Sequence, residues 1–356
     1  MNAKTRNTVL TAVAIALFAV LLWLGDRHLG SYAMRILNLS AIYIVLSLSL
    51  NLVNGFLGLF SLGCAGFMAV GAYVSALLNM SPEVKQMNYF LEPLAPWLQN
   101  LTLPFVVALV AGGLCAALAG LLIGIPVLRL RDDYLAIATL GFGEIIRVVI
   151  TNLQSLTNGA QGLKNIPKRS TTWVVWGVAA LATAFMALLT RSSYGRQIKA
   201  VRDDEIAAEA MGVNVFRVKV VTFTLSAFMA GVGGALLGHM ITTIDPKMFT
   251  FMLTYNILLI VVLGGNGSIT GSVIASIAVT VLMEAMRFLD EPLDLVFVKT
   301  QGIPGLRMVV FSALLLAVII FRQRGLMGDK ELTWDGAADG LAKAGLLPRR
   351  KKGGAE

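Results

Sequence analysis

Long apolar segments separated by short polar ones recur along the whole chain. A helix needs about 20 apolar residues to cross the hydrocarbon core of a bilayer, and a spanning backbone must satisfy its own hydrogen bonds. The pattern therefore predicts an all-α integral membrane protein, a polytopic helical bundle of about ten transmembrane helices. These are Thr8–Gly25, Ile36–Val53, Leu57–Leu78, Leu103–Leu128, Tyr134–Leu153, Thr172–Thr190, Val220–Thr242, Phe249–Leu263, Ile269–Phe288 and Leu306–Phe321. The second and third spans are separated only by a predicted turn at Asn54-Gly55.

One polar segment, residues 191–219, holds ten charged residues between two apolar spans. Asp203 or Asp204 can cap a short helix there, and the N-terminal end of that helix also favours the carboxylate of Glu205. Gly212 can close the helix at its C-terminal cap. One apolar face would then be shared by Ile206, Ala207, Ala210 and Met211. Such a helix suits docking into a groove on a partner, although a helix lying on the bilayer surface has a similar pattern.

Composition and charge refine this topology. The chain is 57% hydrophobic and 14% charged, with a mean hydropathy of +0.77 and a net charge of +9. The distribution of Lys and Arg places both termini, the 191–219 loop and the tail from Arg322 in the cytoplasm. The positive charge also attracts anionic membrane lipid, whereas nucleic acid is disfavoured because the basic residues are dispersed. We expect a transmembrane domain over 1–325 and a mobile basic tail over 326–356.

Catalytic chemistry is mostly absent from the sequence. Cys64 and Cys115 lie inside apolar spans, and neither His28 nor His239 has a partner at ligand spacing. No G-x-S-x-G motif and no G-x-x-x-x-G-K-[ST] phosphate loop is present. We therefore expect no catalytic residue, no metal site and no cofactor in this chain. If nucleotide hydrolysis drives the protein, ATP and Mg²⁺ are used by another chain.

Charged side chains inside spans are costly and are therefore candidates for a solute path. Glu144 and Arg147 lie three residues apart on one helix face, where a structural ion pair is as reasonable as a path lining, and polar Asn152 follows. Glycine-interrupted segments can also line such a path, although Asn-Gly favours a plain turn. The candidates of this kind are Gly55, Gly63, Gly66, Gly265, Asn266 and Gly267.

Small residues spaced by four draw smooth ridges along two predicted helices. Such ridges let helix backbones approach closely in a membrane. They predict packing within the chain or, as the sharper hypothesis, a subunit interface. The ridges are Gly112, Ala116, Gly120 and Gly124, and Ala230, Gly234 and Gly238.

Four motifs together resemble a known family. The run YGRQIKAVRDDEIAAEAMGVNVFRVKVVTFTLSAFMAGVGGAL resembles the cytoplasmic coupling segment of branched-chain amino-acid ABC transporter permeases, specifically the M-type subunit. TLGFGEIIRVV, GLFSLGCAGFMAVGAY and VVLGGNGSITGSVI are similar to other segments of that family, and the resemblance covers roughly residues 36–325. The family's general coupling motif fits Ala207, Ala208 and Gly212, with Ile206 at its acidic position and Glu205 one residue earlier.

The resemblance implies a permease subunit of the bacterial inner membrane for branched-chain or other apolar amino acids. It also implies three kinds of protein partner: a second permease, paralogous or identical, two cytoplasmic ATPases and a periplasmic solute-binding protein. The family's Thr-Gly-Gly-Pro-Asn-Gly loop is replaced here by residues 157–162, TNGAQG, which lack the proline. Because relatives also carry urea and amides, these remain alternative substrates.

Two other function classes stay open at this point. An ion- or proton-driven secondary transporter would use Glu144 and Glu284 as proton carriers, but it would not need the large amphipathic loop at 191–219. An intramembrane enzyme is disfavoured because the chain has no set of nucleophile and base, and no set of metal ligands.

Overall fold

The structure is a computed structural model that describes residues 19–25, 27–28, 30–90, 92–130, 132–290, 293–295, 298–300, 305–321, 325–328 and 331. The chain divides into two units, one of Met1–Arg35 with Lys330–Glu356 and one of Ile36–Asp329. Residues 8–18 of the predicted first span and 332–356 of the predicted tail lie outside the described residues. The larger unit, Ile36–Asp329, carries the sites considered below.

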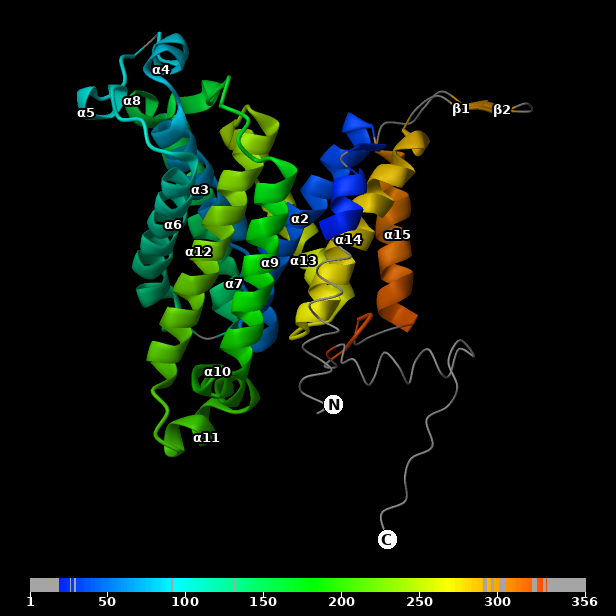
Figure 1. The fold of residues 1–356 in the computed structure, drawn as a ribbon. Coiled ribbons are helices and arrows are strands. Elements are labelled where there is room, and N and C mark those ends of the chain that lie inside the picture. The colour runs from blue at the N-terminus through cyan, green and yellow to red at the C-terminus, as the bar shows by residue number, and fades with distance from the viewer. Residues whose placement is uncertain are drawn as a thin grey trace. The chain divides into compact units, whose positions relative to one another are not determined.

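Helices cover the apolar segments of the described chain (Figure 1). By length and composition, six helices among the described residues are able to cross a membrane: Ser31–Phe56, Phe105–Val127, Tyr134–Asn152, Thr172–Arg191, Val215–Ile241 and Pro246–Gly264. Two shorter apolar helices lie at Cys64–Asn79 and Ile269–Ala285. The helical membrane fold is thus confirmed, while the number of ten spans stays a prediction.

The elements follow the chain in simple order. The longer helices are α2 (Ser31–Asn51), α3 (Cys64–Asn79), α6 (Phe105–Val127), α7 (Asp132–Asn152), α9 (Thr172–Arg191), α12 (Val215–Ile241), α13 (Phe251–Gly264), α14 (Ile269–Ala285) and α15 (Leu306–Phe321). The shorter ones are α4 (Pro82–Asn88), α5 (Pro96–Gln99), α8 (Gln154–Thr157), α10 (Ser193–Asp203) and α11 (Glu205–Ala210). The described chain also contains one π-helix, η1 (Leu52–Phe56), and the 3₁₀ turns η2 (Gly159–Gln161), η3 (Pro246–Met248) and η4 (Met286–Leu289).

A two-stranded antiparallel hairpin precedes α15. It pairs β1 (Leu293–Leu295) with β2 (Val298–Thr300). The all-α prediction contains no strands, and strands of three residues are too short to produce a recognisable alternation of polar and apolar positions.

The predicted turn at Asn54-Gly55 is wrong. The helix begun by α2 continues as η1 to Phe56, and the chain leaves helical structure only over residues 57–63. The backbone N–H of Leu57 donates to the carbonyl of Leu52 at 3.2 Å, as a π-helix requires. Asn-Gly favours a turn when it acts locally. Here tertiary contacts around Gly55, described below, hold the segment in the widened helix instead.

Helices α3, α6 and α12 meet through small residues. A Cβ added to Gly71 of α3 would lie 2.1 Å from the carbonyl oxygen of Gly231 in α12, and one added to Gly112 of α6 would lie 2.7 Å from the carbonyl oxygen of Gly71. At Gly234, the added atom would lie 2.1 Å from the carbonyl oxygen of Met68. These contacts have no room for a side chain. The glycines of both predicted ridges therefore serve packing within the chain, the simpler of the two hypotheses.

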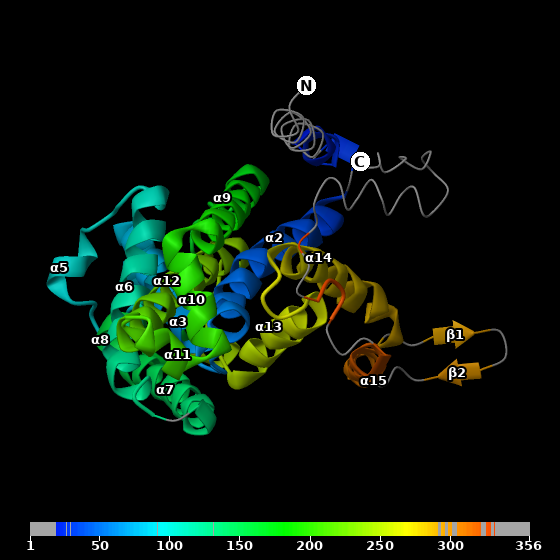
Figure 2. The ribbon, with the colours of Figure 1, turned by 90° about the horizontal axis from the view of Figure 1, so that it is seen from below.

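Helix α2 runs between α12 on one side and α14 on the other (Figure 2). Buried serine side chains form a polar seam that joins the three helices. Ser49 and Ser226 exchange hydrogen bonds, each hydroxyl donating to the other's backbone carbonyl at 2.8 and 2.7 Å. The hydroxyls of Ser47 and Ser276 lie 2.8 Å apart. Buried polar groups in an apolar medium need partners, so the seam fixes the positions of these helices relative to one another.

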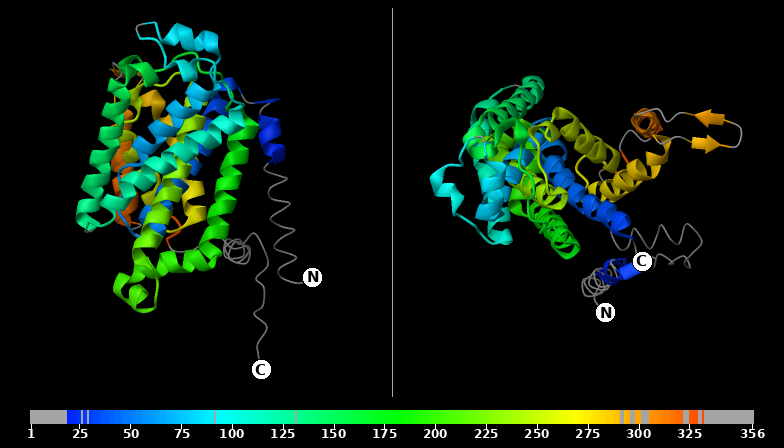
Figure 3. Two further views of the ribbon diagram at one scale, coloured as in Figure 1. Left: turned by 90° about the vertical axis from the view of Figure 1, so that its left-hand side faces the viewer. Right: turned by 90° about the horizontal axis from the view of Figure 1, so that it is seen from above.

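The two ends of the bundle carry different short elements. Helices α4, α5 and α8 lie at one end and α10 and α11 at the other (Figures 1 and 3). At the α4–α5 end, the buried Lys85 ammonium donates to the carbonyls of Leu98 and Leu101 at 2.9 and 2.7 Å. Burial lowers the pKa of Lys85. This side chain therefore clamps the α4–α5 segment through backbone carbonyls.

Candidate functional site

The polar segment predicted at 191–219 contains two short helices, α10 and α11, which lie at one end of the bundle (Figure 1). Asp203 is the last residue of α10, and Asp204 is the N-cap of α11. The Asp204 carboxylate accepts from the backbone N–H groups of Ile206 and Ala207 at 2.9 and 3.0 Å. Of the two predicted caps, Asp204 therefore has the capping role, since its extended backbone lets the carboxylate fold over the first turn.

The C-terminal end of α11 has the predicted glycine cap. The backbone N–H of Gly212 donates to the carbonyl of Glu209 at 2.9 Å, and that of Val213 donates to the carbonyl of Ala208 at 3.1 Å. Gly212 has φ +82°, a conformation that costs glycine little. This pair of bonds is the Schellman arrangement, so both ends of a very short helix are fixed.

The two faces of α11 differ sharply in exposure. Ile206 and Met211 are 82% and 84% exposed, and Ala207 and Ala210 are exposed beside them. The predicted coupling motif includes both Ala207 and Ala208. Ala208, however, is only 4% exposed and faces the rest of the chain. The predicted apolar docking face, defined here as Ile206, Ala207, Ala210 and Met211, is thus exposed.

An ion pair attaches α11 to the bundle. The Glu205 carboxylate lies 2.5 Å from the Lys219 ammonium near the start of α12. The Lys219 side chain is 10% exposed and that of Glu205 is 43% exposed. Sequence reasoning left the role of Glu205 open because its partner lies fourteen residues away, beyond any local spacing rule. The pair gives Glu205 a role in orienting the docking face.

Helix α10 is fastened to α12 by Tyr194. Its hydroxyl donates to the carbonyl of Val218 at 3.1 Å and lies 3.4 Å from the hydroxyl of Thr222. Burial raises the pKa of Tyr194, against opposing effects of the Thr222 hydrogen bond and the Arg217 charge. The phenol therefore keeps its proton at neutral pH and remains a donor.

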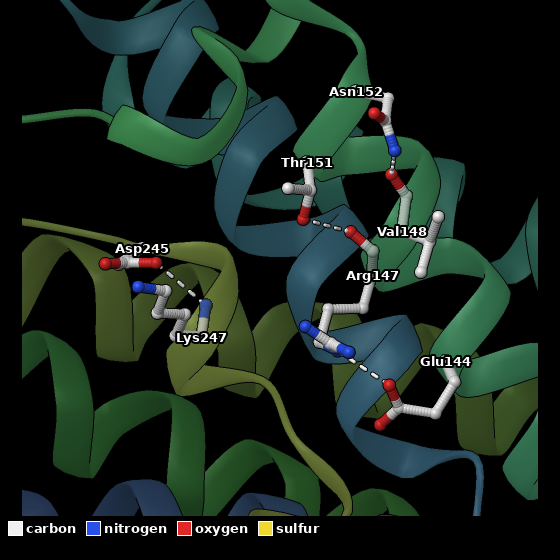
Figure 4. Close-up of polar contacts among 7 residues, drawn as sticks. All are labelled: Glu144, Arg147, Val148, Thr151, Asn152, Asp245 and Lys247. Carbon is white, nitrogen blue, oxygen red and sulfur yellow. Dashed lines mark hydrogen bonds and ion pairs between the residues drawn. The ribbon is translucent and has the colours of Figure 1, made fainter.

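A second candidate region lies on α7, where the predicted pair of Glu144 and Arg147 is formed. The Arg147 Nε donates to the Glu144 carboxylate at 2.7 Å, and Figure 4 shows the two side chains pointing toward one another. The exposed Asn152 side chain instead donates a hydrogen bond from its amide to the carbonyl of Val148 at 2.8 Å. The structure thus separates Asn152 from the charged pair, although the sequence groups all three.

Glu144 also lines a small pocket between α3, α7 and α13. The other lining residues are Leu62, Ala65, Gly66, Leu140, Gly143, Phe249, Phe251 and Thr254. A Cβ added to Gly66 would lie 2.9 Å from the Cα of Gly143, so glycine on α3 lets α7 approach closely. The wall is therefore apolar apart from one carboxylate and one hydroxyl.

The chain segment that enters this pocket is held by side-chain acceptors. The backbone N–H of Leu62 donates to the Thr139 hydroxyl at 3.0 Å, and that of Ala65 donates to the Thr254 hydroxyl at 2.9 Å. Gly63 packs on the carbonyl of Thr139, where an added Cβ would lie 2.9 Å away. Irregular backbone inside a membrane protein needs such partners. Two of the predicted glycines, Gly63 and Gly66, thus accompany Glu144.

The remaining predicted glycines lie elsewhere, near the end of α10. Asn266 and Gly267 form the tight turn that their sequence favours, with Gly265 before it at φ +110°. A Cβ added to Gly55 would lie 2.3 Å from the backbone nitrogen of Gly267. The sequence groups these residues in one solute path, but the structure divides them between two places. Gly63 and Gly66 lie beside Glu144, and the other candidate glycines and Asn266 lie near the end of α10. Among the described residues, no group of three His, Cys, Asp or Glu side chains is arranged to hold a metal.

The chain is similar to known transport permeases over most of its length. A family model described as "Branched-chain amino acid transport system / permease component" matches residues 32–319. The high-affinity branched-chain amino acid transport system permease protein LivM of Escherichia coli (strain K12) is 35% identical over 326 residues, covering 82% of this chain and 69% of that protein. No solved structure matches.

Two more distant relatives are also permeases. The high-affinity branched-chain amino acid transport system permease protein LivH of Escherichia coli (strain K12) is 32% identical over 160 residues, 45% of this chain and 48% of that protein. The L-arabinose ABC transporter permease protein AraH of Azospirillum brasilense is 26% identical over 261 residues, 70% of this chain and 74% of that protein. The relatives thus share a transport role while differing in the solute that their names specify.

Proposed function

Because the chain belongs to the branched-chain amino acid transport permease family, whose members are transport components and not enzymes, we propose that it is a permease subunit of an ATP-binding-cassette importer. Its solutes would be branched-chain or other apolar amino acids. The observation that carries the proposal, beside the family, is the capped helix α11 with an apolar face open to solvent. A helix so fully capped yet so exposed is suited to insertion into a groove of another protein.

The partner at this face would be a cytoplasmic ATPase. Ile206 and Met211 would fill an apolar groove, and the Glu205–Lys219 pair would keep the helix in the orientation that the groove requires. Two ATPases would bind and hydrolyse ATP with Mg²⁺, and their closure would push α10–α11 against the bundle. In this orientation the α4–α5 end would lie on the periplasmic side, and the distribution of Lys and Arg in the sequence would place both termini in the cytoplasm.

The pocket beside Glu144, with a volume of about 10 Å³ in this structure, is about the size of one water molecule and would form part of the solute path once α3, α7 and α13 move apart. An apolar amino acid carries an ammonium, and Glu144 supplies the matching carboxylate, while Leu140, Phe249 and Phe251 offer an apolar wall for the side chain. Arg147 would hold Glu144 in place until the ammonium competes for it. Glu144→Gln should therefore lower uptake of leucine at least tenfold, while Asn152→Ala should leave it within twofold.

The remaining partners follow from the transport cycle. LivM and LivH are two permeases of branched-chain amino acid transport, so a second, paralogous permease would complete the path, although an identical copy is the alternative. A periplasmic solute-binding protein would deliver solute at the α4–α5 end. The complex would lie in a bacterial inner membrane.

The docking face offers the sharpest test of this function. Ile206→Glu combined with Ala207→Trp should abolish ATP-driven uptake and solute-stimulated ATP hydrolysis in the purified complex, without changing the amount of chain in the membrane. Glu209→Gln, on an exposed position of the same helix, should leave both within twofold of wild type. Wild-type uptake and stimulation in the double variant would contradict docking by this face.

Vesicle uptake also separates the alternative functions. ATP inside the vesicle should support uptake of leucine, and dissipation of a proton gradient should not reduce it. Uptake that survives without ATP and collapses with the gradient would favour a secondary transporter using Glu144 and Glu284. Competition by urea, an amide or L-arabinose in place of leucine would reassign the solute.

A further inference from the structure

The side chain of Arg202, at the end of α10, rests on three glycines from two other parts of the chain. Its Nη1 donates to the carbonyl of Gly55 at 3.4 Å. A Cβ added to Gly58 would lie 2.7 Å from the Arg202 Cγ, and one added to Gly267 would lie 3.2 Å from its Nη1. Gly58 and Gly267 have φ +81° and +84°, so the backbone also favours glycine there. Gly58 and Gly267 thus leave room for the Arg202 side chain, and Gly55 supplies its carbonyl acceptor.

Gly267 belongs to a hydrogen-bonded unit that joins its turn to the end of α2, and Gly55 packs against it. Asn51, fully buried at the end of α2, accepts from the backbone N–H of Gly267 at 2.8 Å. Its amide donates to the carbonyl of Ser268 at 2.9 Å and to the hydroxyl of Ser272 at 2.8 Å. The end of α2 and the turn between α13 and α14 are therefore tied together, and Arg202 contacts both.

The guanidinium of Arg202 is itself held in position. Its Nε and Nη2 both donate to one carboxylate oxygen of Asp203, at 3.1 and 3.0 Å. Asp203 directly precedes Asp204, the N-cap of α11, so the side chain is anchored where α10 passes into α11. A movement of α11 must therefore act on Arg202 through two residues of backbone.

The segment that follows α15 also contacts the turn between α13 and α14. The backbone N–H groups of Leu326 and Met327 donate to the carbonyls of Leu263 and Gly264 at 2.8 and 3.3 Å. A Cβ added to Gly325 would lie 2.7 Å from the Cα of Gly265. The turn is thus a junction of α13, α14 and the segment after α15, and a displacement there reaches all of them.

We infer that Arg202 is a positioning residue that transmits movement of α10–α11 to α2 and to the turn between α13 and α14. This inference rests on the proposed function of α11 in docking an ATPase. The helix pair is attached on two sides: Glu205 and Tyr194 hold α12, which packs with α3 and α6. Arg202 contacts Gly55 of η1 and Gly267 of the turn between α13 and α14. Because the Glu144 pocket lies between α3, α7 and α13, a push that moves α13 relative to α3 alters the pocket.

The test measures coupling in the full complex with its ATPases and second permease in vesicles, using leucine as the solute. Arg202→Ala should lower leucine imported per ATP hydrolysed at least tenfold, with ATP hydrolysis within twofold of wild type. Arg202→Lys should lower the ratio about threefold, because an ammonium keeps the charge without the planar fork that reaches both Gly55 and Asp203. Arg196→Ala is the matched control on α10, since Arg196 is exposed and donates to Ser193 in its own helix.

The melting temperature of the complex and the amount of copurifying ATPase complete the readout, and both should match wild type in Arg202→Ala. If the wild-type complex shows ATP-driven uptake and Arg202→Ala imports as much leucine per ATP hydrolysed as wild type, this inference is overturned and the proposed function is not. Loss of ATPase from the complex would also overturn it, by assigning Arg202 to docking. Loss of stability in proportion to uptake would overturn it by assigning Arg202 to folding. Wild-type uptake that does not require ATP would overturn the proposed function together with the inference.

Discussion

The ion pair of Glu205 and Lys219 permits a quantitative prediction about α11. Glu205→Ala leaves the Lys219 ammonium, with a side chain only 10% exposed, without its carboxylate. Removing one partner of a fully buried pair costs about 3–5 kcal/mol, whereas an exposed pair contributes roughly 0.2–1 kcal/mol. Because Glu205 is 43% exposed, solvent screens the pair, and we expect a cost of about 1–2 kcal/mol to the docked position of α11.

A cost of this size should appear as local opening. It corresponds to a shift of roughly 5–30-fold in the open population of α11. Hydrogen exchange should therefore accelerate by that factor at the amides of Ala208, Met211 and Val213, whose N–H groups donate within the helix and its cap. Mass spectrometry of peptides covering residues 205–214 measures it in the purified complex or in the chain alone.

Two further variants separate the ion pair from a general effect of charge. Glu209→Ala removes an exposed carboxylate from the same helix and should change exchange by less than twofold. Adding Lys219→Met to Glu205→Ala replaces the unpaired buried charge by an apolar side chain, and should return exchange to within threefold of wild type. Equal exchange in Glu205→Ala and Glu209→Ala would refute the reasoning.

Three other predictions concern packing, the α2 junction and the α4–α5 end. Gly71→Val should prevent assembly of the bundle in size-exclusion chromatography, because its Cβ would lie 2.1 Å from a carbonyl oxygen, whereas Gly177→Ala, with nothing within 4 Å, should behave as wild type. Asn51→Ala should lower the free energy of unfolding in denaturant by about 2–4 kcal/mol, because it leaves buried groups unpaired. Asn152→Ala, at an exposed position, is its control. A loss below about 0.5 kcal/mol in Asn51→Ala, the size of an ordinary surface substitution, would contradict the prediction. Burial lowers the pKa of Lys85, so the unfolded chain binds more protons between that lowered pKa and about 10.4. The melting temperature of wild type minus that of Lys85→Met should therefore rise from pH 8 to pH 10, and a falling difference would show the opposite shift.

Local spacing was sufficient to predict the caps of α11 and the pair on α7. Asp204 and Gly212 lie at the two ends of a six-residue helix, and their capping bonds span no more than five residues. Glu144 and Arg147 are three apart on one helix, where side chains face one another whatever surrounds them. Predictions of this kind depend only on helix geometry.

Contacts between distant segments decided the features that the sequence left open or misassigned. Gly55 belongs to a turn by its local pair with Asn54, yet Gly267, more than 200 residues later, packs against it and the helix continues. Ala207 and Ala208 are neighbours with the same side chain, and only the packing of α11 on the bundle buries one and exposes the other. No spacing rule predicts such outcomes.

The sequence by itself therefore determined that this chain is a helical membrane protein, which apolar segments form most of its described long helices, and that a capped polar helix lies between two of them. Those properties follow from the cost of placing polar groups in hydrocarbon and from short-range backbone geometry. Only the tertiary structure decided that Glu205 pairs with Lys219, that Arg202 rests on Gly55 and Gly267, and that the candidate path residues occupy two places. Such contacts depend on which helices pack together, and apolar helices in a membrane resemble one another too closely in sequence to specify their neighbours.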